Sequence, residues 1–132
     1  MALPNYEQEY NSQYYKDGDT FSPIVTLVAN GYVTASTKSI SITIPVDKSL
    51  KNINTITVSR LYAQARGQNG YINSTDGYYD FSADSSYTIE ATKSSDKAVR
   101  ININKSTAYT NINNNTLVSL SLGGQTKLTF KE

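Results

Sequence analysis

The chain has 132 residues, a formal net charge of +1 and a 38% share of hydrophobic residues, which is typical of one domain with a single modest core. It contains no cysteine and no histidine, and this excludes disulfides, zinc sites built from these residues, and Ser-His-Asp or Cys-His catalysis. Lysine and arginine occur scattered and no long apolar run is present, so we expect neither a nucleic-acid partner nor membrane insertion.

The N-terminal residues predict a short helix or an extended arm, and both remain open. Tyr6, Tyr10 and Tyr14 recur every four residues after Pro4, which would place them on one face of a helix. Met1 to Tyr10 contain neither the basic segment nor the apolar run of a signal peptide, so we expect no secretion signal.

Period-two alternation of apolar and polar residues dominates the rest of the chain, and this pattern is typical of half-buried antiparallel strands. In three runs the apolar positions are Ile40, Ile42, Ile44 and Val46; Val99, Ile101 and Ile103; and Val118, Leu120 and Leu122. Each run predicts a strand with one face in the core.

The run from Ile56 to Ala65 changes phase in its middle. Its apolar residues hold even positions up to Val58 and odd positions from Leu61 onward. One extra residue shifts the alternation of a strand, so we expect a β-bulge near Ser59 and Arg60.

Turns are predicted at four pairs of residues that tolerate positive φ. These pairs are Asn30-Gly31, Asn69-Gly70, Asp76-Gly77 and Gly123-Gly124. The last pair predicts a tight hairpin that joins a strand over Leu117–Leu122 to one over Thr126–Phe130.

Short strands separated by turns, without interleaved helices, predict an all-β fold. We expect residues 18–132 to form a single antiparallel β-sandwich, with jelly-roll or immunoglobulin-like connectivity left open. Residues 1–17 would form an N-terminal arm that could anchor the domain in an assembly.

Tyrosine supplies most of the aromatic residues, and its ring suits interfaces because one end is apolar and the other polar. An N-terminal set is predicted to serve as an assembly arm rather than to cover the domain's own core: Tyr6, Tyr10, Tyr14 and Tyr15. A second set is a candidate for ligand contact, with half-buried strand positions as an equal alternative: Tyr71, Tyr78 and Tyr79.

Acidic residues offer weaker candidates. Asp76, Asp80 and Asp84 recur every four residues among aromatic residues, and paired carboxylates can hydrolyse glycosides. The favoured interpretation is that they solvate a loop. Calcium binding by these acids, or by Asp17 and Asp19, lacks a nearby bidentate glutamate, so we expect no metal and no cofactor.

From about Tyr14 onward the chain resembles a β-domain of structural proteins in bacteriophages of gut and related bacteria. Five phrases carry the resemblance: Tyr14 to Phe21, Gly31 to Val33, Lys38 to Pro45, Asn114 to Leu120, and Lys127 to Phe130. In that family the domain belongs to tail-fibre, baseplate, head-fibre or decoration proteins. It often follows a longer anchoring region than this sequence has, so the arm is the anchor or the sequence is a piece of a larger protein.

The resemblance implies a non-enzymatic virion protein that is made in the host cytoplasm and contacts other virion proteins. It also implies a homo-oligomer, for which we expect a trimer, and contact with a host surface glycan or protein. The alternatives are a carbohydrate- or receptor-binding module that uses the second tyrosine set, and an enzyme that depends on Asp76 or Asp80.

Overall fold

The computed structural model describes residues 13–23, 29–33, 39–67, 70–71, 77–107 and 116–132. Almost all of its regular structure is β, which confirms the predicted all-β fold. The elements are β1 (Thr20–Phe21), β2 (Ala29–Val33), β3 (Ser39–Pro45), β4 (Thr55–Arg60), β5 (Tyr62–Gly67), β6 (Gly70–Tyr71), β7 (Tyr79–Asp80), the 3₁₀ turn η1 (Phe81–Ala83), β8 (Tyr87–Ser95), β9 (Ala98–Lys105), β10 (Thr116–Leu122) and β11 (Lys127–Lys131).

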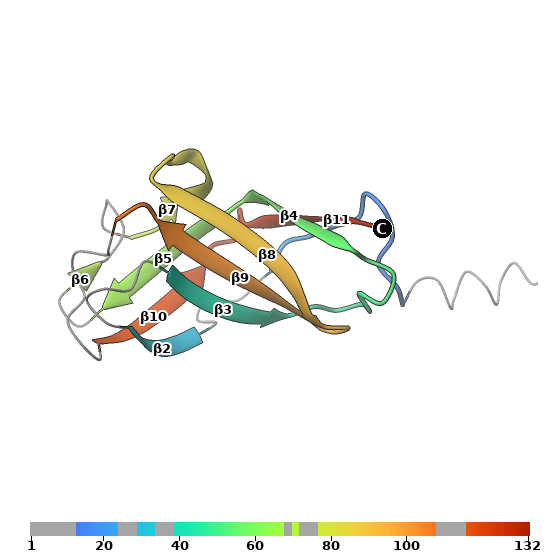
Figure 1. Cartoon of the computed structure of the whole chain (residues 1–132), viewed down its shortest axis with the longest axis horizontal. Helices are drawn as coiled ribbons and strands as arrows, with labels where there is room; N and C mark the ends of the chain where they lie inside the picture. The colour runs from blue at the N-terminus through green and yellow to red at the C-terminus, as the bar shows by residue number, and fades with distance from the viewer. Residues whose placement is uncertain (1–12, 24–28, 34–38, 68–69, 72–76, 108–115) are drawn as a thin grey trace, which may run out of the picture.

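Two antiparallel sheets curl around one core in a sandwich-like arrangement (Figure 1). One sheet has six strands in the order β1-β11-β4-β8-β9-β3. The other has five strands, in the order β2-β10-β5-β6, with β7 paired to β5.

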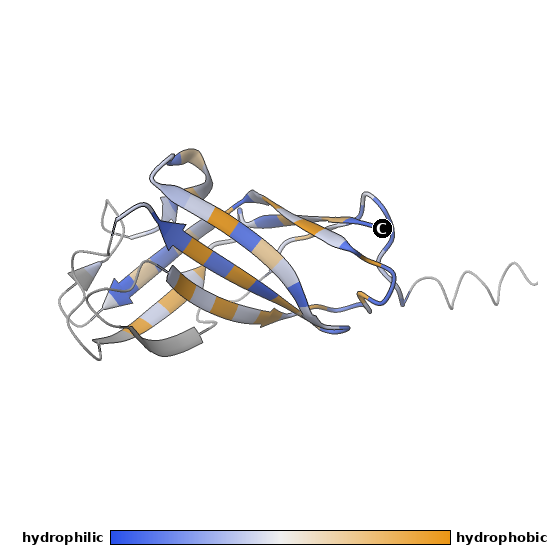
Figure 2. Cartoon of the chain, viewed as in Figure 1, coloured by the Kyte–Doolittle hydropathy of each residue, from blue (hydrophilic) through white to orange (hydrophobic). Residues whose placement is uncertain are grey.

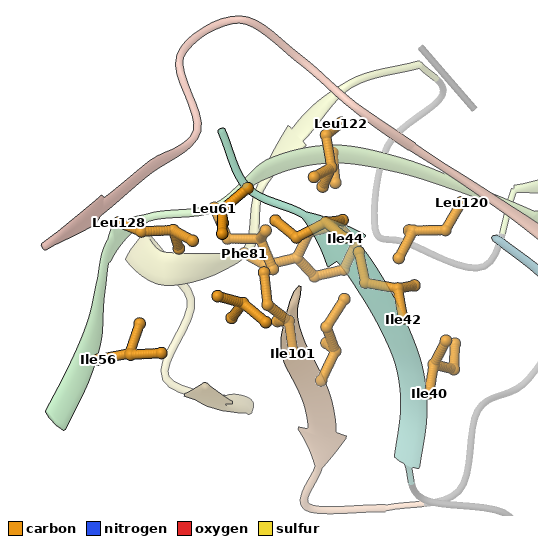
Figure 3. Close-up of a cluster of buried hydrophobic side chains, with 14 of the residues drawn as sticks. Ile40, Ile42, Ile44, Ile56, Leu61, Phe81, Ile101, Leu120, Leu122 and Leu128 are labelled. Atoms are coloured by element: carbon orange, nitrogen blue, oxygen red, sulfur yellow. The ribbon is translucent and has the colours of Figure 1, made fainter. Parts of the chain in front are cut away.

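The core lies between the sheets and is built from the alternating runs. The predicted apolar faces of β3, β9 and β10 are all buried, and Figure 2 shows the alternation along the strands. In the close-up of Figure 3, isoleucines of β3 lie beside Ile101 of β9 and Leu120 of β10. Each such side chain stabilises the fold by about 1.5–3 kcal/mol on burial.

The predicted bulge in the Ile56–Ala65 run is confirmed. Lys127 of β11 is in register with Arg60, whereas the next residue, Leu128, is in register with Val58. Ser59 is therefore the extra residue, and it shifts the buried positions from even to odd numbers.

The predicted hairpin at Gly123-Gly124 is wrong. The strand before it, β10, pairs with β2 and β5, whereas the strand after it, β11, pairs with β1 and β4. Residues 123–126 thus carry the chain from one sheet to the other, opposite Leu61, where β4 passes into β5. The Gly123 N–H donates to the Tyr62 carbonyl at 2.7 Å, and the Thr126 N–H donates to the Gly123 carbonyl at 3.0 Å. Residues 123–126 therefore form a turn, as the Gly-Gly pair predicts, but not a hairpin.

The structure gives different outcomes for the other three predicted turns. Asn30-Gly31 lies inside β2, in register with Ser119 and Val118, so that predicted turn is wrong: pairing to β10 overrides the local preference of the Asn-Gly pair. Gly67 is in register with Gly70, as expected for a turn at Asn69-Gly70, although Asn69 lies outside the described residues. Gly77 has a φ of +84°, as expected for a turn at Asp76-Gly77, although Asp76 lies outside the described residues.

The six-stranded sheet is splayed between β4 and β8, and η1 is packed into one end of the opening, where β4 ends and β8 begins. Within the described residues the register of these strands contains the single pair Ile56 and Ala91. The Phe81 N–H donates to the Leu61 carbonyl at 2.9 Å, and the Phe81 ring is 1% exposed. η1 therefore acts as a wedge at this end of the opening.

Gln13 to Asp17, placed in the arm by sequence, are attached to the folded domain. The Ser49 N–H donates to the Gln13 carbonyl at 2.8 Å, and the Tyr15 N–H donates to the Ser49 carbonyl at 2.9 Å. The Glu132 N–H donates to the Asp17 carboxylate at 3.0 Å, so the first described residues lie beside the C-terminus. In Figure 1, this end is opposite β6 along the longest axis.

Candidate binding surface

Of the four N-terminal tyrosines, the structure describes Tyr14 and Tyr15. Tyr6 and Tyr10 lie outside the described residues, and Tyr14 is half-buried. Tyr15 is 3% exposed and belongs to the core, with its ring centroid 4.4 Å from that of Phe130. Tyr15 therefore fits the alternative interpretation, in which an N-terminal tyrosine covers the domain's own core.

The hydroxyl of Tyr15 is also used inside the domain. It donates a hydrogen bond to the carboxylate of Asp47. Burial raises the pKa of Tyr15 well above its usual range, and the negative charge and hydrogen bond of Asp47 raise it further. The neutral phenol is therefore the form that the fold stabilises.

Tyr79 points into the domain as well. Its ring packs edge-on against Phe81, with centroids 5.2 Å apart, and its hydroxyl donates to the Asp84 carboxylate. That hydrogen bond, together with one from the Ser86 N–H at 2.9 Å, lowers the pKa of Asp84. Tyr79 therefore fits the alternative of a half-buried strand position better than it fits a ligand contact.

Tyr78 has the opposite environment. Among the described residues it is the large hydrophobic side chain that stays exposed, at 38%. Its ring stacks on that of Tyr62 of β5, with centroids 5.5 Å apart and planes 17° apart. One face of the Tyr78 ring is therefore covered by Tyr62, which holds the ring as a platform.

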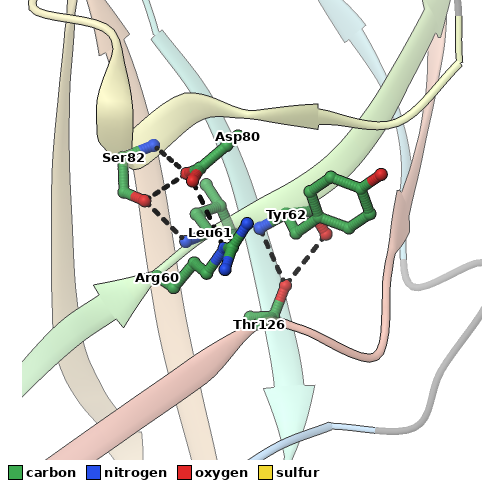
Figure 4. A network of polar contacts seen from close by, with 6 residues as sticks. All are labelled: Arg60, Leu61, Tyr62, Asp80, Ser82 and Thr126. Carbon is green, nitrogen blue, oxygen red and sulfur yellow. Dashed lines mark hydrogen bonds and ion pairs between the residues drawn. The ribbon is translucent and has the colours of Figure 1, made fainter.

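Tyr62 is itself held in place from several sides. The Thr126 hydroxyl accepts from the Tyr62 N–H at 3.0 Å and donates to its carbonyl at 2.9 Å, as Figure 4 shows. The Arg60 guanidinium lies over the ring at 5.8 Å from the centroid. Gly123 approaches so closely that a Cβ there would lie 2.6 Å from the ring.

A polar network borders the stacked rings (Figure 4). Arg60 forms an ion pair with Asp80 at 3.3 Å, and Asp80 also accepts from the Ser82 N–H at 3.1 Å. The Ser82 hydroxyl in turn accepts from the Leu61 N–H at 3.2 Å. Both ion-pair partners are partly exposed, so the pair stabilises the fold little but presents donors and acceptors beside an aromatic ring.

Tyr71 lies on the same sheet, nearer its end. It is in register with Arg66, whose guanidinium lies 5.3 Å from the Tyr71 ring centroid. Arg66, Gln64 and Tyr62 occupy the non-buried positions of β5, and residues in register share a face. The outer face of the five-stranded sheet thus combines aromatic, amide and guanidinium groups.

We define the aromatic surface by Tyr62, Tyr78, Arg60 and Asp80, with Tyr71 and Arg66 further along the sheet. Sequence analysis identified Tyr78 and Tyr71 but not Tyr62. The sequence did contain a signal for Tyr62. After the bulge, the alternation of apolar and polar residues buries Leu61 and Ala63, so the residue between them faces outward. The stacking partner of Tyr62 could not be inferred, since it comes from a different part of the chain.

The acidic candidates serve the local structure. Asp76 lies outside the described residues, while the carboxylates of Asp80 and Asp84 accept hydrogen bonds within the η1 region. In the described part of the chain, no group of acidic residues has a metal-binding arrangement. Asp17 and Asp19 accept backbone N–H groups of Glu132 and Lys16.

Comparisons of the chain with protein-family models, with curated proteins and with solved structures gave no match. Among the described residues, no helix has the length and apolar character needed to span a membrane.

Proposed function

We propose that this protein is a non-enzymatic structural protein of a bacteriophage particle, in a head fibre or decoration or in a tail fibre or baseplate. In this proposal the domain contributes to host attachment by binding a surface glycan on its aromatic surface. Support comes from the resemblance of its sequence phrases to phage β-domains, and from a sandwich-like fold that carries an exposed aromatic platform.

The observation that carries the attachment role is the position of the exposed ring relative to the chain ends. The first described residues and the C-terminus share one end of the longest axis, whereas β6 and β7 lie in the other half (Figure 1). A particle contact at the shared end would leave the half of the domain that contains β6 and β7, and with it the aromatic surface, away from the particle.

The chemistry of the aromatic surface suits a sugar. The free face of an exposed ring attracts the apolar C–H face of a pyranose, and nearby polar groups can bind its hydroxyls. At this surface Tyr78 would supply the ring, while Arg60 and Asp80 would supply a donor and an acceptor. A single shallow contact is weak, so a homo-oligomer, for which we expect a trimer, would gain avidity from several such sites.

A second candidate function is a carbohydrate-binding module that acts outside any particle. The same rigid, exposed Tyr78 ring favours it. The two candidates differ in location and partners rather than in the chemistry of the site.

Tyr78→Ala tests glycan binding, on a glycan array and on intact host cells. We expect at least a tenfold loss of binding with an unchanged fold, because the variant removes the exposed platform. Tyr78→Phe is the matched control and should retain most binding, since it keeps the ring. Binding that survives Tyr78→Ala unchanged would exclude this surface as the glycan site.

Electron cryo-microscopy of the particle encoded beside this gene tests the virion role. We expect density for a sandwich of this size at a capsid or tail site. Particles without such density would favour the free binding module.

A further inference from the structure

A polar hollow lies near the end of the domain that contains the first described residues. It has a volume of about 560 Å³ and is lined by Gln13, Tyr14, Asp47, Lys48, Ser49 and Lys97. This volume is in the range of sites that bind small ligands. A backbone bridge between Tyr14 and Ser49 fixes two of its walls.

The charges in the hollow favour an acidic occupant. The Lys48 ammonium lies 5.5 Å from the centroid of the Tyr15 ring, and the Lys97 ammonium donates to the Asp47 carbonyl at 3.3 Å. Neither lysine forms an ion pair with another described residue. The Asp47 carboxylate already accepts from the Tyr15 hydroxyl.

Two ammonium groups are therefore available to a carboxylate ligand. Charge-assisted hydrogen bonds of this kind are about twice as strong as neutral ones.

The sequence of this chain contains a segment of the required charge. Met1–Ser12 includes Glu7 and Glu9 and has no lysine or arginine. Residues two apart point to the same side of an extended strand, so an extended segment could direct both carboxylates toward the two lysines. The segment also contains tyrosines, whose rings are common at interfaces.

We propose that the hollow binds the segment Met1–Ser12 of a second copy of this chain, with Glu7 and Glu9 facing Lys48 and Lys97. This inference rests on the proposed function, in which the chain forms a homo-oligomer, and it names the contact that would hold the copies together. Gln13 and Tyr14 already form part of the wall of the hollow, so a chain's own segment would have to reverse direction at its rim. Reciprocal exchange between copies fills every hollow in a closed symmetric assembly.

Charge reversal tests the proposal in the full chain, with mass measured by light scattering over a range of concentrations. The hollow variant combines Lys48→Glu with Lys97→Glu, and the segment variant combines Glu7→Lys with Glu9→Lys. We expect each variant alone to associate at least tenfold more weakly than the unmodified chain, because like charges then face each other. A mixture of the two should associate again, at least into mixed pairs, since the hollow of each variant has the charge that the segment of the other needs.

The matched control combines Lys51→Glu with Lys127→Glu, two exposed lysines that do not line the hollow, and it should associate like the unmodified chain. The proposal is overturned if the unmodified chain is a monomer at all concentrations, if either variant keeps its mass, or if the mixture stays dissociated. Glycan binding is measured separately through Tyr78→Ala, so failure of the assembly contact and failure of the attachment role can be told apart.

Discussion

At the scale of single residues, the link between the two sheets depends on close contact at Gly123. An added Cβ would lie 2.6 Å from the Tyr62 Cδ2 atom and 3.1 Å from the Tyr62 carbonyl oxygen. Gly123 is therefore required for space and not for positive φ, since the described glycines with positive φ are Gly18 and Gly77. The same close contact holds the ring on which Tyr78 stacks.

We expect Gly123→Ala to lower the free energy of unfolding by about 1–3 kcal/mol, because overpacking forces the Tyr62 backbone or ring to move. Urea denaturation measures the effect. Gly124→Ala is the matched control, since a Cβ there meets no atom within 4 Å, and it should change stability by at most about 0.5 kcal/mol. Equal effects of the two substitutions would contradict the steric explanation.

Tyr15 makes stability depend on pH in the alkaline range. Its pKa is raised in the folded state by burial and by Asp47, so its contribution is complete below its usual pKa of about 10 and is lost as pH rises above that value. We expect Tyr15→Phe to cost about 1–2 kcal/mol at neutral pH through loss of the hydrogen bond to a carboxylate.

The difference in unfolding free energy between the unmodified chain and Tyr15→Phe should shrink above about pH 10, because only the unmodified chain loses this contribution. Urea denaturation of both proteins at neutral pH and near pH 11 measures the difference. A difference that stays constant with pH would show that Tyr15 does not titrate as the fold requires.

At the scale of elements, η1 acts as a wedge between β4 and β8. Phe81 packs edge-on against Tyr87 of β8, with ring centroids 4.8 Å apart, while its backbone bonds to Leu61 at the end of β4. The wedge also positions Asp80, and hence the ion pair to Arg60.

Phe81→Ala should lower the free energy of unfolding by about 3–5 kcal/mol, as expected for removal of a fully buried ring. We further expect faster amide hydrogen exchange in β4 and β8 than elsewhere, because the end of β4 and the start of β8 lose their contact with the Phe81 ring. Tyr78→Ala is the control, since its ring is exposed, and it should leave this exchange unchanged. Uniform acceleration in every strand would argue against a local wedge.

At the scale of the whole molecule, two long strands belong to both sheets. One passes from β4 to β5 at Leu61, and the other passes from β10 to β11 through residues 123–126. These two stretches of backbone pair with each other in both sheets, as β5 with β10 and as β4 with β11. Neither sheet can therefore separate from the other without breaking part of this pairing. The arrangement also explains why Tyr62 and Arg60 lie at the junction where the aromatic surface forms.

Leu61→Ala tests this coupling, since Leu61 is fully buried at the crossing. We expect a loss of about 2–5 kcal/mol in a single unfolding transition, with coincident curves from circular dichroism and tyrosine fluorescence. Two separate transitions would indicate that the sheets unfold independently.

Local pattern was sufficient to determine much of this fold. Alternation located the buried faces of β3, β9 and β10, and the phase change located the bulge at Ser59, because burial on one face leaves a period of two in the sequence. The absence of cysteine and histidine limits the available chemistry through composition alone. These properties depend on residue types and on neighbours along the chain.

Only the tertiary structure decided which strands pair and which tyrosines stay exposed. Gly123-Gly124 looks like a hairpin locally but links two sheets, because β10 and β11 gain more from pairing with other strands than with each other. Tyr15, Tyr78 and Tyr79 have the same side chain, yet one is in the core, one is exposed and one is bonded to Asp84. Their environments come from residues distant in sequence, such as Phe130 and Tyr62, and no local pattern contains that information.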